Sequence, residues 1–168
     1  MLTLTFHGHA CFTLEADGRR VIIDPFLTGN PATDIPLARL PKIDAVLLSH
    51  GHGDHLGDAR GQFTTNPCGV VVTMGGRTVY HCGDTGLTME MQLLAGGVDA
   101  MLVPIGDNYT MGVEDAVRAV EFVQPRAVIP MHYNTWDVIK ADPEQFKRQV
   151  GGRARVVVLA PGEAHTLS

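Results

Sequence analysis

The sequence lacks the features that define several large classes of protein. Its 168 residues include only three cysteines, which lie far apart and form no Cys-x-x-Cys pair, so we expect neither a disulfide framework nor a zinc ribbon. No stretch approaches the roughly 20 continuous apolar residues of a transmembrane helix. Basic residues number 13 against 18 acidic ones, and no basic patch stands out, which argues against a nucleic-acid partner.

What the sequence contains is typical of one folded domain. Hydrophobic residues make up 45% of the chain, too many for a disordered protein. The length fits a single domain over residues 1–168. The first six residues have no basic start and no cleavage pattern, so we expect no signal peptide. Unpaired cysteines are typical of a reducing compartment, and we therefore expect a cytoplasmic protein that does not contact membranes.

Hydrophobic patterning predicts a layered α/β (α+β) fold, because strands come first and then alternate with helices. The Asp17-Gly18 and Gly75-Gly76 pairs each separate two strand-like runs and predict hairpins. Residues 45–48 form a continuous apolar run, as in a strand buried on both faces. Helices are predicted at residues 112–123 and from Asp142 onward. Strands are predicted at residues 2–6, 11–16, 19–24, 45–48, 69–73, 78–81, 100–104, 126–131 and 155–159.

Side chains that can bind metal ions follow four of these strands. They are Asp24, the cluster at residues 50–55, Asp84 and His132. Ligands of α/β proteins gather at the carboxyl ends of strands, so several such side chains at one sheet edge predict a polynuclear metal site. A single histidine in a loop is usually a solvated turn residue, but His-x-His-x-Asp-His directly after a strand is not explained that way.

The cluster HGHGDH at residues 50–55 resembles the hallmark motif of the metallo-β-lactamase superfamily. Other segments resemble one branch of it, the small bacterial metal-dependent hydrolases related to sugar-phosphate lactonases. These segments are 6–12 (FHGHACF), 23–26 (IDPF), 80–86 (YHCGDTG), 104–108 (PIGDN) and 130–135 (PMHYNT). The resemblance covers nearly the whole chain, and its motifs are specific in combination.

The resemblance implies an αββα sandwich with a dinuclear metal site between its two sheets. It assigns His50 and His52 to a first metal ion, Asp54, His55 and His132 to a second ion, and Asp84 to a bridge between them. Asp54 and Asp84 are the residues we expect to be catalytic. The cofactors would be two divalent ions, zinc first and manganese or iron as alternatives. A metal-bound hydroxide would then cleave an ester, lactone or phosphodiester bond of a small-molecule substrate.

The sequence departs from the family in its first half. The family has a further metal-binding histidine between the 50–55 cluster and the Gly-Asp-Thr-Gly segment, but residues 56–80 contain none. The chain is also too short here, and part of the first half is missing between about residues 58 and 66. Either the protein is truly shortened, or the full protein has a stretch that this sequence omits. An intact mass well above 18.1 kDa would prove omission.

Further residues are weaker candidates. His7, His9 and Asp24 could support the metal ligands through hydrogen bonds or have purely structural roles. Three residues that follow strand ends could contact the substrate: Asn108, Tyr109 and Asn134.

Three other functions compete with hydrolysis. The absent histidine is compatible with a metal-binding scaffold or sensor that has lost catalysis. An RNA-processing nuclease would normally need several Lys or Arg contacts to phosphates. A di-iron redox enzyme would usually need a flavin partner, and no Gly-x-Gly-x-x-Gly motif is present. The resemblance alone leads us to expect a homo-oligomer.

Overall fold

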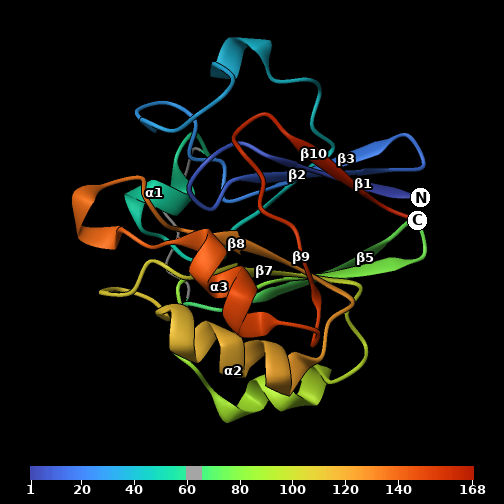
Figure 1. The fold of residues 1–168 in the computed structure, drawn as a ribbon. Helices are drawn as coiled ribbons and strands as arrows, with labels where there is room; N and C mark the ends of the chain where they lie inside the picture. Colours follow the sequence, from blue (N-terminus) through green and yellow to red (C-terminus); the bar gives the residue numbers. More distant parts are fainter. Residues whose placement is uncertain (60–65) are drawn as a thin grey trace.

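The computed structural model describes residues 1–59 and 66–168, which form two five-stranded sheets that face one another (Figure 1). The first sheet has antiparallel neighbours except for β3 and β4, which are parallel. In spatial order its strands are β10 (Ala164–Leu167), β1 (Leu2–Phe6), β2 (Phe12–Ala16), β3 (Arg19–Ile23) and β4 (Ala45–Leu47).

The second sheet is mostly parallel, and only its β5–β6 hairpin is antiparallel. All five residues of β7 and of β8 are buried, as expected for central parallel strands that are covered on both faces. In spatial order the strands are β5 (Val70–Met74), β6 (Arg77–His81), β7 (Ala100–Pro104), β8 (Ala127–Met131) and β9 (Arg155–Val156).

Helices cover the outer face of the second sheet (Figure 1). In α2 (Val113–Val123) the apolar stripe seen in the sequence is the buried face, which includes Ala116, Val120 and Val123. In α3 (Pro143–Val150) the carboxylate of Asp142 accepts a hydrogen bond of 2.9 Å from the Glu144 amide, and proline occupies the first turn. Both helices confirm the sequence prediction. The 3-10 helix η2 (Met89–Leu94) packs beside α2.

The core lies between the two sheets and beneath the helices. Leu4, Phe12 and Leu14 of the first sheet and Leu102 and Val103 of the second are fully buried in one apolar cluster. Burying each such side chain contributes about 1.5–3 kcal/mol relative to leaving it exposed. The predicted layered α/β sandwich is therefore confirmed, and both predicted hairpins are present as β2–β3 and β5–β6.

Two predictions about strands need correction, and one strand was not predicted. Residues 45–48 are not buried on both faces: among the described strands β4 lies at the edge of its sheet and pairs with β3 alone, and Val46 is 48% exposed. The last predicted strand, residues 155–159, is shortened to β9. The sequence analysis also missed β10, which adds to the edge of the first sheet beside β1. Edge strands are short and weakly patterned because only one side is paired, so periodicity identifies them poorly.

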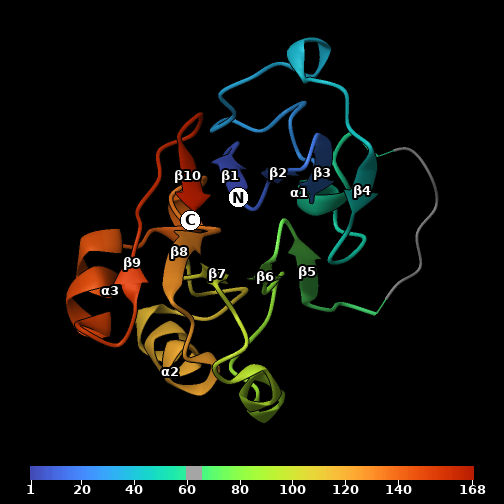
Figure 2. The ribbon, with the colours of Figure 1, turned by 90° about the vertical axis from the view of Figure 1, so that its right-hand side faces the viewer.

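Figure 2 looks along the strands of both sheets and shows β4 and β5 on the same side of the sandwich. The shorter elements of the first half are η1 (Leu37–Arg39) and α1 (Gly53–Leu56). A third 3-10 helix, η3 (Asp137–Ile139), follows β8. None of the described helices has the length and apolar character needed to cross a membrane.

Candidate metal centre

The structure brings all six predicted ligand residues into two adjacent groups. Ligand atoms within each group lie within 4.8 Å of one another. The first group contains His50, His52 and Asp84. The second group contains Asp54, His55 and His132, together with His9. The same division into two metal positions was expected from the sequence, apart from His9; we call these groups the first and second metal positions.

Strand ends and short turns explain why these side chains meet. His50 and His52 follow β4, and Asp54 and His55 lie on the single turn of α1. His132 follows β8 with a left-handed backbone, at φ 53°. Because β4 and β8 belong to opposite sheets, the candidate ligands come from both sheets, and each metal position combines side chains of the two.

Asp84 lies between the two positions. One carboxylate oxygen, Oδ1, is 3.0 Å from His55 Nε2 and 3.3 Å from His132 Nε2. The other, Oδ2, is 3.8 Å from His50 Nε2. A carboxylate that faces the ligands of both positions with different oxygens is suited to bridging two cations.

Several buried polar atoms at this point have no hydrogen-bond partner among the described residues. They are His55 Nε2, Asp84 Oδ1, and both ring nitrogens of His132. An unpaired buried polar group costs about 1–3 kcal/mol, so such groups are rare unless an ion or water satisfies them. Imidazole and carboxylate are the ligand types that zinc, manganese and iron accept. The residues present therefore fit divalent metal ions.

Asp24 supports both metal positions from behind. Its fully buried carboxylate accepts hydrogen bonds from the Ser49 amide (2.7 Å), the Ser49 hydroxyl (2.6 Å) and His55 Nδ1 (2.7 Å). Since the Ser49 hydroxyl donates to Asp24, it can accept from His50 Nδ1, which is 3.0 Å away. These acceptors hold a proton on Nδ1 of both histidines, so Nε2 is the nitrogen that would bind a metal ion once it has lost its own proton. These contacts are the ones that the supporting role, one of the two alternatives for Asp24, requires.

The charges of the site follow from these contacts. Burial by itself would lower the pKa of His55, but Asp24 and Asp84 raise that pKa to about 10. Burial opposes ionisation of Asp84, yet the neighbouring His132 and His55 hold its pKa well below the usual range. The hydrogen bond from His9 lowers the pKa of Asp54 to about 2. Both carboxylates are therefore ionised at neutral pH and available to cations.

Two other histidines make hydrogen bonds outside both metal positions. His7 places its ring nitrogens 2.9 Å from Asp34 Oδ1 and 2.8 Å from Thr13 Oγ1, outside both metal positions. His81 donates from Nε2 to the Ala10 carbonyl and accepts at Nδ1 from the Gly83 amide, so its ring is fully used.

A cavity of about 400 Å³ opens over the metal positions. Ligand residues form its floor, and Tyr109, Trp136 and Pro67 form its walls. Asn108 does not line it, and the side chain of Asn134 is held outside it by two hydrogen bonds of 3.0 Å to the Ala141 backbone. Of the three predicted substrate contacts, the structure places only Tyr109 at the cavity. Trp136 and Ser49 were not predicted from the sequence. For Ser49 a signal was available, because this residue lies just after a strand.

Comparison with known proteins agrees with this geometry. The family model of the beta-lactamase superfamily domain matches residues 3–65 and 57–132. The chain belongs to the metallo-β-lactamase superfamily. It is 37% identical to a UPF0173 metal-dependent hydrolase of Pyrococcus furiosus, with 98% of this chain and 99% of the relative covered. It is 40% identical to one of Carboxydothermus hydrogenoformans, with 96% and 98% covered.

Solved structures of the superfamily have the same fold. Igni18, a metallo hydrolase from Ignicoccus hospitalis, has a TM-score of 0.90 at 32% identity and covers 99% of this chain and 98% of its own. A Thermotoga maritima protein, described as a Zn-dependent hydrolase of the metallo-β-lactamase superfamily, has a TM-score of 0.67 at 26% identity, with 94% and 98% covered. This superfamily member is a metal-dependent hydrolase.

The comparisons also locate the difference in length. The alignment with the Pyrococcus furiosus relative runs over 223 positions, whereas this chain has 168 residues, so the relative contains a segment without a counterpart here. The two parts of the family match overlap at residues 57–65, which places the interruption there, as predicted for residues 58–66. Residues 60–65 themselves lie outside the described part of the structure. Among the described residues, the first metal position contains two histidines and no third, which the family resemblance led us to expect.

Proposed function

We propose that this chain hydrolyses the ester or lactone bond of a small, uncharged substrate, using two divalent metal ions, with zinc as the first candidate. The observation that carries the proposal is the convergence of unpaired buried atoms of His55, Asp84 and His132 on one point. When bound, such ions would acidify a water molecule and polarise the scissile oxygen. No serine or cysteine nucleophile is then required.

The residues of the chain have separable tasks in this proposal. His50, His52, Asp54, His55 and His132 bind the ions, and Asp84 links the two positions. Asp54 and Asp84 remain ionised, so they hold positive charge at the site and cannot act as proton donors at neutral pH. Asp24 orients His55 directly and His50 through Ser49.

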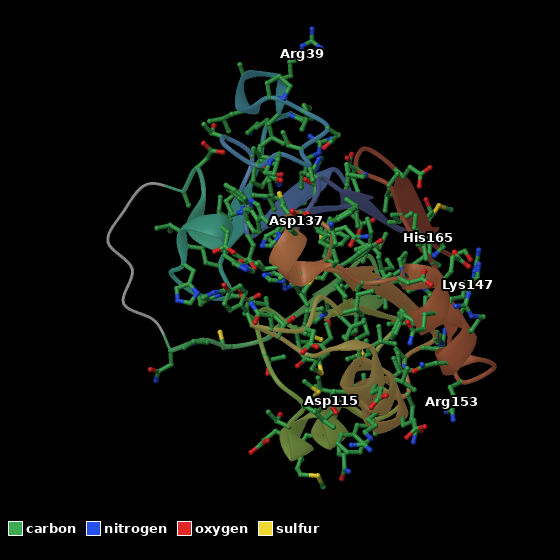
Figure 3. All side chains as sticks on the ribbon, turned by 60° about the vertical axis from the view of Figure 1, so that its left-hand side comes forward. Arg39, Asp115, Asp137, Lys147, Arg153 and His165 are labelled. Atoms are coloured by element: carbon green, nitrogen blue, oxygen red, sulfur yellow. The ribbon has the colours of Figure 1, made fainter. Side chains whose placement is uncertain are left out.

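The cavity walls favour an uncharged substrate over a phosphodiester. Tyr109, Trp136 and Pro67 are uncharged, and no Lys or Arg belongs to the described lining of the cavity. The basic side chains Arg39, Lys147 and Arg153 project from the outside of the molecule (Figure 3). A phosphate group would normally be met by such side chains. The same distribution disfavours the nuclease alternative.

The test combines composition with turnover. Protein purified without chelator should contain about two metal ions per chain by elemental analysis, beside an intact mass that shows whether the chain is 18.1 kDa. It should hydrolyse members of a panel of uncharged esters and lactones faster than phosphorylated lactones or phosphodiesters. Metal-replete protein that cleaves no compound of this panel would contradict the proposal.

A metal-binding scaffold or sensor is the second candidate. It is supported by the first metal position, which has only three protein ligands in the described part of the chain. This function predicts at most one metal ion per chain and no turnover, so the same measurement separates it from the hydrolase.

We also propose that the protein acts in the cytoplasm and as a homo-oligomer. The unpaired state of Cys11, Cys68 and Cys82 supports the first statement, and family resemblance alone supports the second. Light scattering of the purified protein tests the oligomeric state.

A further inference from the structure

His9 has an unusual backbone conformation beside the second metal position. It follows β1 in a tight turn at φ 59°, a region that non-glycine residues seldom adopt. The preceding Gly8 has φ 97°, and a Cβ there would lie 2.5 Å from the Ala32 carbonyl oxygen. The His9 carbonyl accepts a hydrogen bond of 2.8 Å from the His132 amide. The turn therefore couples the backbone of His9 to that of a ligand residue on the opposite sheet.

The ring of His9 is buried and oriented at both nitrogens. Nδ1 is 2.9 Å from Thr135 Oγ1, and Nε2 is 3.2 Å from Asp54 Oδ2. His9 belongs to the group whose ligand atoms lie within 4.8 Å of one another, with Asp54, His55 and His132. Metal-binding histidines usually have this arrangement, in which one nitrogen is held by a neighbour and the other faces the ion.

The packing around His9 agrees with a ligand role. Its ring centroid is 4.0 Å from that of His132 and 5.5 Å from that of His55. Three imidazoles and one carboxylate thus surround one point. The ring centroid of Trp136 lies 4.9 Å from that of His9. A hydrogen bond to Asp54 would need only one nitrogen of one histidine, and it does not explain why two further imidazoles face the same point.

We propose that His9 is a fourth protein ligand of the second metal position, with Asp54, His55 and His132. This inference refines the proposed metal site and does not depend on which bond the enzyme cleaves. It makes the two positions unequal, because the second has four protein ligands besides the bridging Asp84, and the first has only His50 and His52 besides Asp84. The second position is then the tight one.

Cobalt(II) binding tests the proposal without any substrate. Removing His9 as a ligand should weaken the tighter cobalt site by more than about 100-fold, since even the loss of a supporting residue typically costs 10–100-fold. The variant is His9→Ala, and the matched control is His7→Ala, a buried histidine of the same turn whose partners are Asp34 and Thr13. Circular dichroism of both variants verifies folding.

A second variant reports ligation directly. In His9→Cys loaded with cobalt(II), a thiolate ligand would add a sulfur-to-cobalt charge-transfer band in the near ultraviolet, and His7→Cys should show none. The proposal is overturned if His9→Cys takes up cobalt without this band, because His9 would then be a positioning residue. It is also overturned if His9→Ala keeps the wild-type dissociation constant. Wild-type protein that binds no cobalt would instead contradict the proposed metal-dependent function.

Discussion

The two metal positions differ in how deeply their side chains are buried. The second position is formed largely by buried side chains, whereas in the first His50 is buried, Asp84 is partly covered and His52 is exposed. His50 and His52 directly follow β4, the edge strand of its sheet. His132 follows β8, which is buried between two strands and beneath the helices. Both positions combine side chains that follow strands of the two sheets, so the difference between them lies in ligand number and burial and not in which sheet carries them.

The largest effect is expected when the second position is broken. His132→Ala should lower kcat/KM by about 10³-fold, because metal ions supply several kcal/mol of transition-state stabilisation. The variant should also retain less than one metal ion per chain. His52→Ala should keep about one ion, since it affects only the weaker position. Elemental analysis measures the metal content of each variant and steady-state kinetics measures its kcat/KM, with His165→Ala on β10 as the control. Equal metal loss in His132→Ala and His52→Ala would contradict the expectation that the second position binds its ion more tightly than the first.

Metal removal should occur in two stages. Because the positions differ in protein ligands and burial, we expect their dissociation constants to differ by about 100-fold or more. Titration of the two-metal protein with a chelator, followed by competition measurements, should show one ion leaving first while the other remains. Loss of both ions at the same chelator concentration would show that the positions are equivalent.

Changes behind the ligands should have intermediate effects. Asp24→Asn removes an ionised partner of His55 and disturbs Ser49, so metal affinity at both positions should fall by about 10–100-fold. Ser49→Ala leaves the contact between Asp24 and His55 and should weaken mainly the first position, through His50. Isothermal titration with zinc distinguishes the two patterns. A Ser49→Ala protein that loses affinity mainly at the second position would refute this assignment of support.

The smallest effect concerns the edge of the first sheet. Val46→Thr should change the free energy of unfolding by less than about 0.5 kcal/mol, because Val46 is 48% exposed. The same substitution at Val79, which is fully buried in the second sheet, should destabilise by about 1–3 kcal/mol because it buries a hydroxyl. Urea denaturation of both variants makes the comparison. A large loss at Val46 would show that this edge is covered in solution.

Much of the fold was predictable because local patterns reflect local geometry. The Asp17-Gly18 turn and the apolar stripe of α2 each require only neighbouring residues, and both predictions were confirmed. Burial of β4 was mispredicted because an apolar run gives no information on whether a neighbouring strand exists. The distinction between Tyr109 and Asn134 could not be made either, since both follow strands and only side-chain direction separates them.

The sequence by itself determined which residue types meet at the metal centre, because His50, His52, Asp54 and His55 are neighbours along the chain and Asp84 and His132 are placed by strand ends. Only the tertiary structure decided that His9 joins them, since its ring is oriented by Thr135, 126 residues away. Tertiary packing likewise decided that Asp24 holds His55 and that β4 remains at an open edge. Contacts between distant segments depend on how the two sheets pack, and no short sequence pattern determines which distant residues this packing brings together.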